Sequence, residues 1–175
     1  MNVRMRTKYL TVSAMLAALS VVVLMLGSFV EVLDLSTAAF ASILCLYAVI
    51  EIGGVYPWMI WLVTSVLGIL LLPVKTPAIF YALFAGFYPI LKAKLEKLRA
   101  SVSWILKLLT FHVCLAAMVA ALLLFVPGGL VFEGWWWLPV ATYALCLVCF
   151  VAYDIALTRV ITFYLIRLHH RFHIK

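Results

Sequence analysis

The chain has 175 residues, of which 69% are hydrophobic and 11% charged, and its formal net charge is +7. A soluble domain carries about 25% charged residues and leaves much of its surface in water, so this composition excludes a water-soluble fold. The basic residues lie between apolar segments or near the ends of the chain, as topology determinants do, and no nucleic-acid partner is expected. The closely spaced apolar segments predict a single all-α transmembrane domain spanning residues 1–175.

Six apolar segments follow one another along the chain, each near the length of about 20 residues that crosses a bilayer. They predict transmembrane helices over about residues 9–28, 35–52, 55–73, 77–92, 104–126 and 138–160. The second and fourth segments are short, which predicts extension past their flanking charges or a tilt. The first segment is too long for a cleaved signal peptide, and no small-x-small cleavage site stands out after it.

The connections between these spans carry turn residues. Gly53-Gly54 with Pro57 separates the second span from the third, and Pro73 and Pro77 separate the third from the fourth. Proline and glycine break helices and permit tight reversals. Residues 92–99, between the fourth and fifth spans, predict a short amphipathic helix or a helical extension at the membrane surface.

Charge predicts the orientation of the bundle. Basic residues gather in the N-terminal segment, in the loop after the fourth span and in the C-terminal segment: Arg4, Arg6, Lys8, Lys92, Lys94, Lys97, Arg99, Arg167, Arg171 and Lys175. The alternate loops hold Glu31, Asp34 and Glu133, with Lys75 as their single basic residue. Because cytoplasmic loops are enriched in Lys and Arg, both termini are expected in the cytoplasm.

The predicted outer side has the residues of a ligand-binding mouth. Lys75 lies between two prolines, Tyr81 lies near the start of the fourth span, and the last outer loop holds Glu133 beside Trp135, Trp136 and Trp137. Aromatic walls with a few charged groups suit a small, flat ligand with a polar head. The alternative is that the three Trp form an interfacial belt and that Lys75 is an ordinary loop cation.

His112 and Asp154 are among the ionisable residues that fall within predicted spans, where such groups are costly. His112 lies about two turns into the fifth span, and Asp154 lies near the cytoplasmic end of the sixth. One interpretation places both in a polar cluster inside the bundle. In the other, Asp154 reaches the membrane surface and His112 bonds a neighbouring carbonyl.

The sequence offers no catalytic set. It has no nucleophile-and-base motif, no phosphate-binding loop and no metal-ligand pattern, so neither enzyme activity nor a cofactor is expected. Cys146 and Cys149 share a helix face within an apolar span, where cysteine commonly packs as a small hydrophobe. We interpret this pair as structural, and a metal-binding or redox pair as the alternative.

Small residues mark the cytoplasmic half of the first span. Ala14 and Ala18 form a small-xxx-small pair that allows another helix to approach closely. The surrounding stretch, residues 8–20, resembles the opening of substrate-binding S components of energy-coupling factor (ECF) transporters. These are six-helix proteins of similar length found in bacterial and archaeal cell membranes, with both termini inside.

The resemblance implies an importer subunit. Its fold would be the S-component bundle, its ligand a small vitamin-like solute taken from outside, and its partners a transmembrane T component and two cytoplasmic ATPases. Only Ala14 and Ala18 match a motif of the family, whereas Lys75, Tyr81, Glu133 and residues 135–137 are assigned to the solute from their position. The alternative is a scaffold protein of the cell envelope with no transport activity. An aromatic-lined cavity opening outward distinguishes the importer subunit from the scaffold.

Overall fold

The computed structural model describes residues 3–30, 33–125 and 137–168, and these residues form helices and turns with no strand. This confirms the predicted all-α class. Five helical segments among them are long and apolar enough to cross a membrane by length and composition: Arg4–Phe29, Asp34–Glu51, Thr76–Leu95, Ser101–Ala120 and Leu138–Ile166. The fold is therefore compatible with a helical membrane protein.

The described residues form seven α-helices and two π-helices. They are α1 (Val3–Phe29), α2 (Asp34–Glu51), α3 (Tyr56–Leu71), α4 (Thr76–Phe80), the π-helix η2 (Tyr81–Ala85), α5 (Tyr88–Leu95), α6 (Ala100–Phe125), α7 (Leu138–Phe163) and the π-helix η3 (Tyr164–Leu168). The third predicted span corresponds to α3, whose 16 residues fall just below the roughly 17 to 25 that usually cross a bilayer. The number of six crossings stays a prediction.

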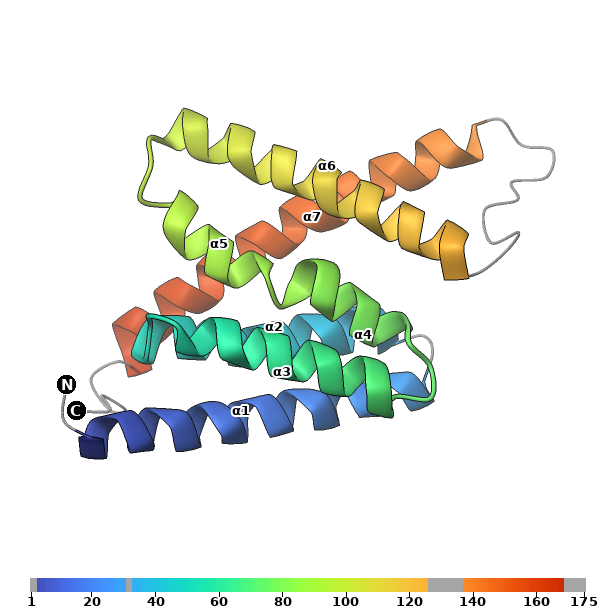
Figure 1. Ribbon diagram of the computed structural model, residues 1–175. Coiled ribbons are helices and arrows are strands. Elements are labelled where there is room, and N and C mark those ends of the chain that lie inside the picture. The colour runs from blue at the N-terminus through green and yellow to red at the C-terminus, as the bar shows by residue number, and fades with distance from the viewer. Residues whose placement is uncertain (1–2, 31–32, 126–136, 169–175) are drawn as a thin grey trace. The chain divides into compact units, whose positions relative to one another are not determined.

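The chain forms two compact units, residues 1–118 and residues 119–175, and α6 begins in the first and ends in the second. Within the first unit, α2 contacts α1, α3, α4, η2 and α5. Figure 1 shows α1 in blue running alongside α2 and α3. The core of this unit includes residues of α1, α2, α4 and η2 together with Leu72 at the end of α3.

The turn from α2 to α3 uses the two glycines that the sequence singles out. Gly53 and Gly54 have φ angles of 65° and 64°, in the left-handed region that side chains with a Cβ disfavour. Pro57 lies in the first turn of α3, where its missing N–H costs no helical hydrogen bond. The reversal therefore brings the start of α3 back against α1 and α2.

The helices of the first unit approach closely at small residues. A Cβ atom on Gly27 of α1 would overlap the Thr37 side chain of α2, and one on Gly68 of α3 would lie 3.2 Å from the Ala78 Cβ of α4. Small residues of this kind allow helices in a membrane to gain dispersion contacts between their backbones. These two contacts are closed by the chain itself.

The fourth predicted span is interrupted, whereas the sequence predicted one helix over residues 77–92. The π-helix η2 follows α4, and the Gly86–Phe87 turn separates it from α5. The Gly86 N–H donates to the Tyr81 carbonyl at 2.8 Å, and a Cβ at Gly86 would collide with the Tyr81 ring and Trp61. The helix thus bends where a bulky ring requires a glycine opposite it, and α5 continues to Leu95 as the predicted extension.

Candidate functional site

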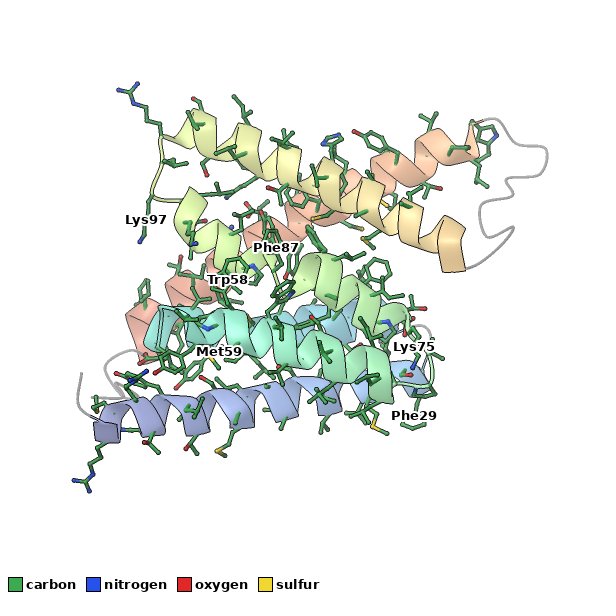
Figure 2. The ribbon with its side chains drawn as sticks, viewed as in Figure 1. Phe29, Trp58, Met59, Lys75, Phe87 and Lys97 are labelled. Atoms are coloured by element: carbon green, nitrogen blue, oxygen red, sulfur yellow. The ribbon has the colours of Figure 1, made fainter. Side chains whose placement is uncertain are left out.

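A narrow apolar slot of about 200 Å³ lies between α1 and α3. Its lining comprises Leu10, Ser13, Ala14, Ala17, Ala18, Met59, Ile60, Val63 and Leu67. Figure 2 shows Met59 on the side of α3 that faces α1. The α1 residues of the slot run from Leu10 to Ala18, which lie about 12 Å apart along the helix axis at roughly 1.5 Å per residue.

The small-residue pair predicted from the sequence lines this slot. Ser13 and Ala17 are buried, whereas Ala14 and Ala18 are exposed. Residues four apart lie on one face of a helix, so the two exposed alanines form a shallow strip along the edge of the slot. Large side chains are missing from this strip, which leaves the α1 backbone accessible to another helix.

Ser13 is the unsatisfied polar group in the slot. Its side chain is 4% exposed, and its Oγ atom has no hydrogen-bond partner among the described residues. In contrast, Ser20 donates to the Leu16 carbonyl at 2.8 Å, and Ser65 donates to the Trp61 carbonyl at 2.7 Å. A buried hydroxyl without a partner costs about 1–3 kcal/mol. The described residues therefore leave one buried polar group of the slot wall unsatisfied.

A second cavity, of about 800 Å³, opens at the N-terminal end of α1 and meets the slot at Leu10 and Met59. Its walls are the first turns of α1, the Gly53–Gly54 turn and the start of α3, with Arg6 as the charged group in the lining. We call this cavity the mouth; its lining is Arg6, Thr7, Tyr9, Leu10, Ile52, Gly53, Gly54, Val55, Tyr56 and Met59.

The residues predicted to bind a solute have structural contacts of their own. Lys75 is exposed, and its Nζ donates to the carbonyl of Leu72, the residue that ends α3. Tyr81 is fully buried in the core of the first unit. Trp137 precedes α7, and its carbonyl accepts from the Ala141 N–H at 3.0 Å. Glu133, Trp135 and Trp136 lie outside the described residues, so the solute site stays a prediction.

His112 is exposed, and its Nδ1 lies 2.7 Å from the Leu108 carbonyl, the kind of contact that the second interpretation expects. Asp154 lies in α7, in the other unit, and its carbonyl accepts a hydrogen bond from Thr158 Oγ1 at 2.9 Å. The polar cluster of the two residues stays a prediction.

Sequence reasoning missed a charged cluster near the end of α5. Lys92 is fully buried, and its Nζ lies 3.1 Å from Glu96 Oε1, which also lies 3.6 Å from Lys107 Nζ of α6. The spacing of Lys92 and Glu96, four residues apart, could have indicated their pair. Lys107 could not have been found this way, because only the fold brings α6 against the end of α5.

An aromatic cluster was also missed. Trp58, Trp61 and Phe87 have ring centroids 5.8 to 6.3 Å apart, and Lys94 Nζ lies 5.3 Å from the Trp58 ring centroid. Figure 2 shows Trp58 and Phe87 directed toward one another. The Trp61 indole N–H donates to the Ala82 carbonyl of η2 at 3.0 Å, so the cluster supports the interrupted helix.

Comparison with known proteins finds no matching family model, no matching curated protein and no matching solved structure. The resemblance of residues 8–20 to S components therefore stays a proposal.

Proposed function

We propose that this chain is a membrane-embedded, solute-binding subunit of an ECF-type importer, which docks a helix of a transmembrane partner in the slot of α1. The observation that carries the proposal is the strip of exposed Ala14 and Ala18 beside the apolar slot. Helices in membranes associate closely where small residues let their backbones approach, and this strip offers such a surface.

The distribution of charge supports the direction of this docking. Arg4, Arg6 and Lys8 precede the slot in α1, which favours a cytoplasmic location for this end of the helix in a bacterial cell membrane. A T component and the ATPases attached to it would meet the chain there. In this proposal, energy comes from the partners, and the residues assigned to the solute stay those predicted from the sequence: Lys75, Tyr81, Glu133, Trp135, Trp136 and Trp137.

Docking is tested with a paired substitution and a matched control. Ala14→Leu with Ala18→Leu fills the slot, whereas Ala116→Leu with Ala120→Leu makes the same change at two exposed alanines of the same spacing in α6. Co-expressed with the T component and ATPases of its host, the first double variant should lose at least about tenfold of the co-purified T component. The second should retain it within about twofold. Equal retention by both variants would refute docking through the slot.

Solute binding is tested separately, by mass spectrometry of small molecules released from the purified full-length chain. The expected result is one water-soluble compound, present in near-stoichiometric amount and absent from a mock purification. A chain that retains a T component but never a solute would contradict the solute-binding part of the proposal.

A further inference from the structure

The mouth combines a cation with a largely apolar wall. Arg6 is its charged lining residue, and Thr7, Tyr9 and Tyr56 supply hydroxyl groups. Leu10, Ile52, Val55 and Met59 form its apolar part and lead toward the slot. A water-soluble ligand would leave most of this wall unmatched, whereas a molecule with an anionic head and an apolar chain matches both parts.

The charge in the mouth is not neutralised by the described part of the chain. The Arg6 guanidinium makes no ion pair with a described carboxylate, and no Asp or Glu is part of the lining. A guanidinium forms two parallel hydrogen bonds with a phosphate group, which makes an anionic phosphodiester its natural partner.

The position of the mouth fits the surface of a bilayer. It lies where α2 ends and α3 begins, beside the first turns of α1. The rings of Tyr9 and Tyr56 meet edge to face there, with centroids 5.8 Å apart. Tyrosine prefers the level of the lipid headgroups, because its ring is apolar and its hydroxyl requires a polar partner.

We propose that the mouth binds one anionic phospholipid, with its phosphodiester at Arg6 and its glycerol and upper acyl chain against Leu10, Ile52, Val55 and Met59. The site is separate from the helix-docking strip, which Ala14 and Ala18 form further along α1. Because the mouth and the slot share Leu10 and Met59, the bound lipid would lie beside the end of a helix docked in the slot.

The test uses the full-length chain in nanodiscs that contain equal parts of phosphatidylglycerol and phosphatidylcholine. Native mass spectrometry, after transfer to detergent, measures which lipid stays bound. The expected result for the unmodified chain is one retained phosphatidylglycerol, preferred about fivefold over phosphatidylcholine, since one basic residue near a membrane surface contributes about 1 kcal/mol.

Arg6→Gln should abolish this preference, and Arg4→Gln is the matched control. Arg4 is exposed and lies on the same turns of α1 but does not line the mouth, so its substitution removes the same charge. The control should change the preference by less than about twofold. Equal losses from the two variants would overturn the proposal, because they would indicate attraction by the general charge of α1. An unmodified chain without preference would also overturn it.

A competition experiment distinguishes the lipid from a free phosphate ligand. Added glycerol phosphate should leave the bound phosphatidylglycerol in place, because it lacks the acyl chain that Leu10 and Met59 contact. Displacement of the bound phosphatidylglycerol by glycerol phosphate would assign the mouth to a soluble phosphate compound and overturn the lipid proposal.

Discussion

The helix α1 presents small residues at two places, and the two places differ in what fills them. Near its C-terminal end, Gly27 is covered by Thr37 of α2, which leaves no room for a Cβ atom. Near its N-terminal end, Ala14 and Ala18 stay exposed beside an apolar slot. Small residues on α1 therefore form a completed contact with α2 at Gly27, whereas at Ala14 and Ala18 they leave an open surface.

The polar groups next to the two places repeat this difference. Thr37 Oγ1 donates to the carbonyls of Leu33 and Asp34, at 3.0 and 3.1 Å. Ser13 Oγ has no partner among the described residues. The contact at Gly27 is therefore completed within the chain, whereas the strip of Ala14 and Ala18 is open for association.

The largest expected effect is that of Gly27→Leu, which breaks the completed contact. A side chain there must displace Thr37 or separate α1 from α2, and overpacking of this kind costs about 1–3 kcal/mol or somewhat more. Thermal unfolding of the purified chain in detergent should show a clearly lowered midpoint. Gly27→Ala combined with Thr37→Ala should recover part of the loss, and an unchanged midpoint for Gly27→Leu would show that the helices are not in contact there.

A smaller loss of stability is expected from Glu96→Gln. This substitution tests the ion pairs of Glu96 with Lys92 and Lys107. Glu96 lies within 3.6 Å of the ammonium groups of two lysines, and Lys92 is fully buried. Removing a partner of a buried charge costs about 3–5 kcal/mol. Glu96 is 37% exposed, so water screens its interaction with the lysines. We therefore expect the substitution to lower the free energy of unfolding by about 1–2 kcal/mol.

Lys97→Gln is the control for this substitution, because Lys97 is exposed and adjacent in sequence. It should change the free energy of unfolding by less than about 0.5 kcal/mol. The measurement is unfolding by denaturant in mixed micelles. Equal effects of the two variants would mean that the charged cluster does not stabilise the end of α5.

Ser13→Ala should have an effect of opposite sign. It removes a buried hydroxyl without a partner, so the isolated chain should gain up to about 1 kcal/mol of stability. Ser20→Ala, which loses the hydrogen bond to the Leu16 carbonyl, should bring no such gain. A destabilised isolated chain would indicate that Ser13 already has a partner.

The smallest effect on the isolated chain is expected for Ala14→Leu. The residue is exposed, and substitutions at such positions usually stay within about 0.5 kcal/mol. This variant adds a large side chain to α1, as Gly27→Leu does. The difference between the unfolding midpoints of the two variants therefore measures how much less tightly α1 is packed at Ala14 than at Gly27. A loss as large as that of Gly27→Leu would show that the slot is closed by the chain itself.

Several features of the site were accessible to sequence reasoning. Ala14 and Ala18 follow from the spacing of small residues, and the Gly53–Gly54 turn follows from the conformational freedom of glycine. The interruption of the fourth span at η2 was not predicted. Gly86 is crowded by the Tyr81 ring of the same span and by the Trp61 ring of α3, and the sequence does not show that α3 lies there. The mouth was also missed, since its walls come from residues more than 40 positions apart in the sequence.

The helical class and the positions of the small and charged residues follow from the sequence alone. These properties depend on composition and on local spacing along one chain. Which small residues are covered depends on the tertiary structure. The same holds for the hydrogen bond of Ser20, for the lack of a partner for Ser13 among the described residues, and for the place of Tyr81 in the core. The reason is that burial depends on which helix lies opposite, and residues distant in sequence supply that surface.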